Sequence, residues 1–163
     1  MKKIPLYQGK FALIDDDDFE RVNRFKLVAV RFGTSGWYVY CEAKGKRIFL
    51  HRLALGLPQA RFPRVDHKDR NGLNNQKSNL RFCTGSQNKA NQTKNKNNKS
   101  GFKGVSWSAR DKNWKAYIGF QYKTIALGLF ENKIDAAIAY DEAAKKYFGE
   151  FALLNNPKAI SNV

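Results

Sequence analysis

The sequence has few cysteines, no long apolar run and few acidic residues. Its two cysteines, Cys41 and Cys83, lie in apolar, strand-like segments and lack the spacing of zinc ligands, which predicts buried free thiols in a reducing cytoplasm. No apolar run reaches the length of a membrane span, and the N-terminal segment lacks the apolar core of a signal peptide. These absences favour a cytoplasmic protein without a membrane partner.

Acidic residues are scarce where basic residues are dense. The chain of 163 residues carries 30 Lys and Arg against 14 Asp and Glu, a net charge of +16, which favours a polyanionic partner such as nucleic acid. No acidic residue lies between Asp69 and Asp111, where the basic residues are Arg70, Lys77, Arg81, Lys89, Lys94, Lys96, Lys99, Lys103 and Arg110. A basic membrane-surface protein would need an amphipathic helix with lysines opposite large apolar residues, and the sequence has none. We therefore expect double-stranded DNA as the partner, no small-molecule substrate, and a monomer as the favoured oligomeric state.

One stretch combines two strand patterns with a long polar loop. The run Phe62 to Val65 predicts a strand with Asp66-His67 at its end, and Leu80 to Thr84 predicts a second strand. The Asn-rich loop between them, Lys68 to Asn79, is unusually long for a compact domain unless it has a function.

A short helix is predicted after the second strand, over 87–91, with Ser86 as its N-cap. The loop would bring Asn88 of this helix opposite Asp66 and His67. A carboxylate and a carboxamide oxygen form a hard site suited to Mg²⁺ or Mn²⁺. An imidazole with an ordinary pKa of about 6.5 suits proton abstraction near neutral pH. A metal ion beside a base can hydrolyse a phosphodiester bond, and this combination of residues in this order indicates a nuclease.

The pattern Asp66-His67, then Asn79-Leu80-Arg81, then Ser86 and Asn88 resembles the HNH, or ββα-metal, homing endonucleases of phages and introns. The resemblance implies that His67 is the general base and that Asn79 pins the loop that holds it. It also implies that Asp66 and Asn88 bind one divalent cation. Many relatives carry His at the position of Asn88, and the amide oxygen makes Mg²⁺ more suitable than Zn²⁺.

The segments before this stretch predict a β-rich region. His51-Arg52-Leu53 resembles a segment common in the same family, and His51 is interpreted as structural or phosphate-contacting. The run Asp15 to Asp18 precedes a predicted short helix, so we interpret these carboxylates as helix N-terminal charges rather than as a metal site. The expected elements are a hairpin over 4–14, a helix over 19–25, strands over 26–32, 37–43 and 47–51, and a helix over 51–56.

The last third of the chain predicts a separate unit. Strands are expected over 102–108, 114–120 and 123–130, followed by a helix over 133–149 that Asn132 and Gly149 cap. The predicted fold class is therefore α+β. It comprises a nuclease domain over 1–91 with a ββα-metal core over about 62–91, a basic linker over 92–100, and a three-stranded antiparallel sheet packed on one helix over 101–156.

The motifs G-F-K-G-V-S-W, W-K-A-Y-I, L-G-L-F, A-A-I-A-Y-D-E-A-A and F-G-E-F-A-x-L-N of this unit resemble the DNA-binding domain of plant ethylene-response factors, the Apetala type. The resemblance implies a sheet that lies in the major groove. Plant members carry base-contacting Arg or Trp at strand positions that here are Ser106, Ser108, Gly119, Thr124 and Ala126, so their target sequence does not transfer. The candidate DNA contacts are Arg81, Lys89, Lys94, Lys96, Lys99, Lys103, Trp107, Arg110, Lys112, Trp114 and Lys115. Strand packing explains Trp107 and Trp114 equally well.

Together these patterns predict a site-directed DNA endonuclease of the homing type, from a phage or mobile element, with one Mg²⁺ or Mn²⁺ ion and a histidine base. If it is phage-encoded, it would act in the host cytoplasm. The alternative is a non-cutting DNA-binding regulator on the same fold. A structural RNA-binding protein is a weaker alternative because no RNA-binding motif is visible.

Overall fold

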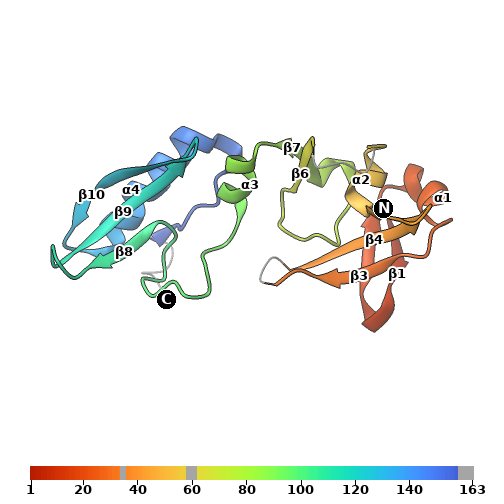
Figure 1. The fold of residues 1–163 in the computed structure, drawn as a ribbon, viewed down its shortest axis with the longest axis horizontal. Helices are drawn as coiled ribbons and strands as arrows, with labels where there is room; N and C mark the ends of the chain where they lie inside the picture. Colours follow the sequence, from red (N-terminus) through yellow and green to blue (C-terminus); the bar gives the residue numbers. More distant parts are fainter. Residues whose placement is uncertain (34–35, 58–61, 158–163) are drawn as a thin grey trace. The chain divides into compact units, whose positions relative to one another are not determined.

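The computed structural model describes residues 1–33, 36–57 and 62–157. The chain forms two compact units, Met1–Thr84 and Gly85–Val163, each of which is described by itself (Figure 1). Within the described residues, small antiparallel sheets and short helices form a mixed α+β fold, as the sequence predicts. No helix in the described part of the chain has the length and apolar character to cross a bilayer.

The first unit begins with a hairpin. Strands β1 (Lys2–Pro5) and β2 (Phe11–Ile14) pair antiparallel and are joined by the 3-10 turn η1 (Tyr7–Gly9). Gly9 has a φ of +66°, which an L side chain adopts only with strain, and this explains a glycine at the predicted turn. A 3-10 turn η2 (Asp16–Asp18) and the helix α1 (Phe19–Val22) follow, so the predicted helix over 19–25 ends earlier than expected.

A three-stranded sheet forms the middle of this unit. Its order is β3 (Val28–Arg31), β4 (Trp37–Ala43) and β5 (Lys46–Phe49), all antiparallel. Helix α2 (Leu50–Ala54) follows β5 directly, so His51 lies in a helix rather than at a strand end. The main buried cluster of the unit takes side chains from β1, β2, β4, α1 and α2 and from Leu6, which follows β1. Its members are Ile4, Leu6, Ala12, Ile14, Val22, Val39 and Leu50.

Two further strands carry the predicted nuclease motif. Strand β6 (Arg64–His67) pairs antiparallel with β7 (Leu80–Cys83), and the register places Asp66 opposite Arg81. The strand predicted over 62–65 therefore starts and ends two residues before β6, and Asp66 and His67 belong to the strand itself. The loop between the strands contains the 3-10 turn η3 (Lys77–Asn79). Both cysteines are free thiols, as predicted, although Cys83 is only partly buried.

The second unit starts with helix α3 (Gly85–Asn91). The helix begins one residue before Ser86, so Ser86 lies in its first turn instead of serving as the predicted N-cap. Strands β8 (Val105–Ser108), β9 (Asn113–Phe120) and β10 (Lys123–Phe130) form an antiparallel sheet in the order β10-β9-β8 (Figure 1).

Helix α4 (Lys133–Phe148) follows this sheet, and the 3-10 turn η4 (Gly149–Phe151) follows the helix. The side chain of Asn132 accepts a hydrogen bond from the Ile134 N–H at 2.9 Å, and Gly149 has a φ of +52°, so both predicted caps are confirmed. The three strands and the helix thus occur in the predicted order.

The core of the second unit lies between its sheet and its helices. Ala116 and Ile118 of β9 are buried against alanines of α4, whose small side chains permit close approach. Ala90 of α3 packs in the same cluster as Ile118 and Tyr140. Helix α3 therefore groups with the second unit, and the compact first unit ends at Thr84, before the predicted domain end at Asn91.

Candidate active site

Asp66 is a buried carboxylate at the centre of the β6–β7 pair. Its cross-strand neighbour Arg81 donates to Asp66 Oδ2 from Nε at 3.0 Å, and Arg81 Nη2 lies 2.9 Å from the same oxygen. Both side chains are nearly excluded from solvent, with exposed fractions of 7% for Asp66 and 10% for Arg81. Arg81, a predicted DNA contact, thus forms a buried salt bridge with the predicted metal ligand.

His67 is held between aromatic rings and a buried amide. The ring of Tyr38 from β4 meets it edge-on at 5.8 Å between centroids, and the ring of His51 from α2 does so at 5.3 Å. Burial lowers the pKa of His67, opposed by its hydrogen bond to Asn75 and by the charges of Asp69 and Asp66. The lowered pKa keeps the imidazole neutral near pH 7, which is the form that accepts a proton.

The contact with Asn75 identifies the protonated ring nitrogen. Asn75 Oδ1 lies 3.3 Å from His67 Nε2, and Asn75 Nδ2 donates to the Gly72 carbonyl at 3.4 Å. Since an amide oxygen only accepts hydrogen bonds, this network assigns the N–H to Nε2. The lone pair of the imidazole then lies on Nδ1. Sequence reasoning did not single out Asn75, because many asparagines of the loop share the same local pattern.

Asn79 closes the loop that follows His67. Its Oδ1 accepts from the Asp69 N–H at 3.0 Å, and its Nδ2 donates to Asp69 Oδ1 at 2.9 Å and to the Asn74 carbonyl at 2.8 Å. Burial raises the pKa of Asp69, but hydrogen bonds from Asn71, Asn74 and Asn79 outweigh it and hold this pKa below its ordinary value. The side chain of Asn79 therefore ties both ends of the loop together.

The N-terminal hairpin forms backbone hydrogen bonds with the same loop. The Leu13 N–H donates to the Leu73 carbonyl, and the Asn75 N–H donates to the Leu13 carbonyl, both at 2.8 Å. On its other contact surface, Gly72 allows the loop to lie close to β4, because a Cβ there would lie 2.4 Å from the Trp37 carbonyl oxygen. The Asn-rich loop is thus a fixed part of the first unit.

The aspartate run lies in the turn before α1, where its charges were predicted, and two of its carboxylates also contact the loop. Asp15 Oδ2 accepts from the Lys77 N–H at 2.8 Å, and the buried Asp18 lies 2.9 Å from Lys77 Nζ and 2.6 Å from Arg21 Nη2. Neither Asp15 nor Asp18 caps its helix with a side-chain hydrogen bond. These carboxylates are used for tertiary contacts, which local sequence patterns do not reveal.

The ring of His51 contacts two other rings, those of His67 and Phe49. Its ring stacks on Phe49 at 5.6 Å with an interplanar angle of 13°. Burial, followed by the charges of His67 and Arg52, lowers the pKa of His51 to about 3. Both imidazoles of the protein are therefore neutral at physiological pH, and they lie in contact although sixteen sequence positions, from 51 to 67, separate them.

The second predicted metal ligand, Asn88, lies on α3 in the second unit. Its Oδ1 accepts from Gln92 Nε2 at 3.4 Å, and the side chain is partly buried. Asp66 belongs to the first unit, so the pairing of these two residues around one cation stays a prediction. Within the described ranges, no group of three or more His, Cys, Asp or Glu side chains is arranged to hold a metal ion.

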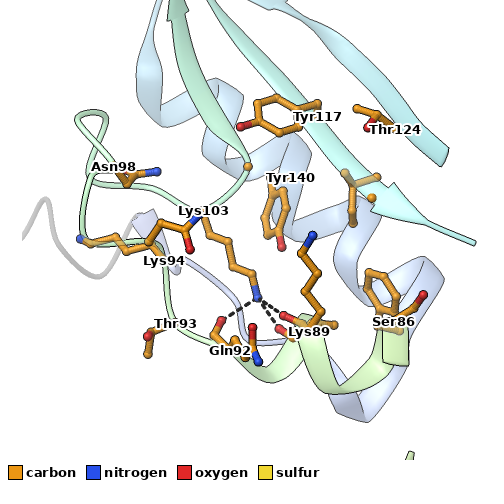
Figure 2. A pocket seen from close by; sticks show the side chains of 16 residues that line it. Ser86, Lys89, Gln92, Thr93, Lys94, Asn98, Lys103, Tyr117, Thr124 and Tyr140 are labelled. Carbon is orange, nitrogen blue, oxygen red and sulfur yellow. Dashed lines mark hydrogen bonds between the residues drawn. The ribbon is translucent and has the colours of Figure 1, made fainter. Parts of the chain in front are cut away.

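Most of the predicted DNA contacts are exposed, and several of these side chains also have partners within the chain. The exposed ones are Lys89, Lys94, Lys96, Lys99, Trp107, Arg110, Lys112 and Lys115. Arg110 lies 3.4 Å from the Asp111 carboxylate. Lys94 donates to the Gly101 carbonyl at 2.8 Å. Lys103 donates to three carbonyls at the end of α3, those of Lys89, Ala90 and Gln92 (Figure 2). Lys103 thereby satisfies helix-terminal carbonyls that have no partner within the helix.

The two tryptophans face each other across β8 and β9. Trp107 and Trp114 are register partners, with ring centroids 5.2 Å apart at 67°. Val105 and Ala116, which lie two positions along each strand, are buried on the side where α4 packs. Trp107 and Trp114 therefore lie on the α4 side of the sheet, where Trp114 packs against the core and Trp107 is 52% exposed.

One curated relative covers most of the chain. The sequence is 34% identical over 152 residues to an uncharacterized HNH endonuclease of Acanthamoeba polyphaga mimivirus, an alignment that spans 91% of this chain and 76% of the relative. No family model and no solved structure matches the chain. The length of this alignment means that it includes residues of both compact units. With the Asp66-His67 motif, the protein belongs to the HNH endonuclease family.

Proposed function

We propose that the protein is a DNA endonuclease that hydrolyses phosphodiester bonds, with His67 as the general base. The observation that carries this proposal is the buried, neutral imidazole of His67 at the end of β6, oriented by Asn75. The name of the viral relative supports the same activity. The net charge of +16 supports DNA as the substrate, since phosphate contacts dominate affinity for nucleic acids.

His67 would take the proton of the attacking water. With Nε2–H donating to Asn75, Nδ1 carries the lone pair that accepts this proton as the new oxygen–phosphorus bond forms. The imidazolium that results lies near Asp69 and Asp66, whose negative charges favour it. Asn79 would act as a positioning residue, because its three hydrogen bonds hold the loop that begins directly after His67.

Asp66 and Asn88 would hold one divalent cation. A carboxylate oxygen and an amide oxygen are hard donors, and this donor set fits Mg²⁺ or Mn²⁺ with water and a substrate phosphate as the other ligands. The Asp66 carboxylate forms a buried salt bridge with the Arg81 guanidinium, so a cation bound here would share this carboxylate with Arg81. When bound, such an ion would stabilise negative charge on the scissile phosphate and the leaving oxygen. Arg81 would hold Asp66 in place before the ion binds.

The second unit would direct the enzyme to its target, as in a homing-type nuclease of a phage or mobile element. Residues paired by register share one face of a sheet. On the face away from α4, Lys115 is paired with Ser106 and Leu129, and Tyr117 is paired with Ala126. Lys115 and Tyr117 are exposed there. An open sheet face with basic and aromatic side chains suits contact with a DNA groove.

Cleavage of supercoiled plasmid with Mg²⁺, with and without excess chelator, tests the proposal. The His67→Ala protein should cut roughly 10²–10⁴ times more slowly than wild type, the usual contribution of a positioned base, with DNA affinity nearly unchanged. Ser78→Ala, an exposed change in the same loop, is the matched control and should cut normally. Wild-type cutting by His67→Ala, or full cutting in chelator, would contradict the mechanism. DNA binding without cutting in Mg²⁺ or Mn²⁺ would instead support the alternative function, a non-cutting DNA-binding regulator.

A further inference from the structure

A cavity of about 320 Å³ lies within the second unit, away from the residues of the nuclease motif (Figure 2). One wall is α3 with the segment that follows it, and the other is formed by β9, β10 and α4. The cavity lies where the sheet narrows: β8 pairs with β9 only as far as Ala116, whereas β9 continues to Phe120. Its volume is at the small end of the range for ligand pockets, which suits one compact chemical group.

The charge of the cavity wall has one sign. Three lysines line it, Lys89, Lys94 and Lys103, and no Asp or Glu is among the described residues that do so. Lys103 is fixed by its bonds to the α3 carbonyls, and Lys94 by its bond to the Gly101 carbonyl. Lys89 is exposed, and its side chain extends from α3 into the cavity (Figure 2). A concave site lined by ammonium groups favours an anion.

Tyr140 of α4 adds a hydroxyl donor. Its hydroxyl points toward the α3 side of the cavity, and the Lys89 side chain extends from α3 in the opposite direction, into the cavity (Figure 2). Burial, with smaller contributions from Asp141 and Tyr117, raises the pKa of Tyr140 to about 12, so the phenol keeps its proton. Gly104, with a φ of +71°, lets the chain pass this ring, because a Cβ there would lie 2.0 Å from Tyr140 Cδ2. The close approach of Gly104 therefore places Lys103, the residue before it, near Tyr140.

We propose that this cavity binds a phosphate group, with Lys89 as the ionic contact and Tyr140 as a hydroxyl donor. Phosphate offers several acceptor oxygens to donors that come from different elements, and it carries the charge that three lysines favour. The group could belong to the DNA backbone or to a free phosphate compound, since the chemistry of recognition is the same. Only the DNA source rests on the proposed nuclease function; the phosphate site itself does not.

Titration of the full-length protein with inorganic phosphate, followed by ¹H–¹⁵N NMR at an ionic strength matched with chloride, tests the site. We expect saturable shifts of amide signals around the cavity, such as those of Thr93, Gly104 and Gly119. Lys89→Ala should weaken phosphate binding roughly 10- to 100-fold, the usual effect of losing a hydrogen bond to a charged group. Tyr140→Phe keeps the ring and should weaken it several-fold, by about 2- to 10-fold.

The matched control is Lys133→Ala, which removes the same charge from an exposed position outside the cavity and should leave phosphate binding unchanged. Equal weakening by Lys133→Ala and Lys89→Ala, or no saturable shift beyond that caused by chloride, would overturn the proposal. If duplex DNA displaces phosphate and Lys89→Ala lowers the salt slope of DNA affinity by about 0.9, the group is a backbone phosphate. If DNA does not displace it, the site serves free phosphate compounds.

The same titration separates this proposal from the nuclease mechanism. The His67→Ala protein should bind phosphate as wild type does, because His67 lies in the first unit and does not line the cavity. Loss of cleavage with intact phosphate binding, or the reverse, would therefore show which of the two proposals fails.

Discussion

Acidification from about pH 7 to about pH 5 should destabilise the first unit by about 2 kcal/mol through His51 alone. In the unfolded chain the imidazole has its ordinary pKa of 6.5, whereas burial in the folded unit lowers the pKa of His51 to about 3. Near pH 5 the unfolded state therefore binds a proton that the folded state does not, and each pH unit below 6.5 costs about 1.4 kcal/mol. This stability is present above pH 6.5 and is lost as the pH falls toward 3. Burial lowers the pKa of His67 as well, which adds to the loss in the same direction.

Urea denaturation followed by NMR signals of each unit, at the two pH values, measures this effect. Both histidines lie in the first unit, so the second unit is an internal control whose stability should change little. The His51→Gln protein should lose about 2 kcal/mol less than wild type over this pH range. The pKa values of Asp16, Asp18 and Asp69 are lowered from 3.8, so these carboxylates stay charged at pH 5 in both states and contribute little.

Equal stability of the first unit at both pH values would refute the reasoning, as would a full pH-dependent loss in His51→Gln. The first result would mean that His51 protonates as freely in the folded unit as in the unfolded chain, and the second would mean that another group causes the loss. The outcome also bears on catalysis, since the proposed base must be neutral at working pH and His51 contacts His67 directly.

Two further predictions concern the loop and the metal. Asn79→Ala should lower the free energy of unfolding of the first unit by about 3 kcal/mol, because it removes three hydrogen bonds from a buried side chain. If the Asn79→Ala protein is as stable as the Ser78→Ala protein in the same urea assay, these bonds do not hold the loop. Asp66→Ala and Asn88→Ala should each abolish Mg²⁺-dependent plasmid cutting, whereas Asn88→Asp should keep part of it because a carboxylate can replace the amide oxygen. Normal cutting by Asn88→Ala across Mg²⁺ concentrations would remove that residue from the site.

Strands, helix caps and motif order depend on residues close together in the sequence, and these features were predictable. The alternating run 37–43 is strand β4, and the Asn132 and Gly149 caps bound α4 as expected. The strand–loop–strand order around Asp66-His67 and membership of the HNH family also followed from local residue order. Hydrophobic periodicity, capping side chains and turn glycines act within a few residues, so a single sequence contains most of the information that specifies them.

The partners of the functional side chains depended on tertiary structure. Asp66 pairs with Arg81 through strand register, and the ring of His67 on β6 contacts the ring of His51 on α2. Asp15 bonds to the loop between β6 and β7 instead of capping a helix with its side chain, and Lys103 donates to carbonyls at the end of α3. These contacts join residues far apart in the chain, where packing and register select one partner among many of the same chemical type. Local pattern identifies which residues can carry the chemistry, whereas long-range packing determines their charge, orientation and availability.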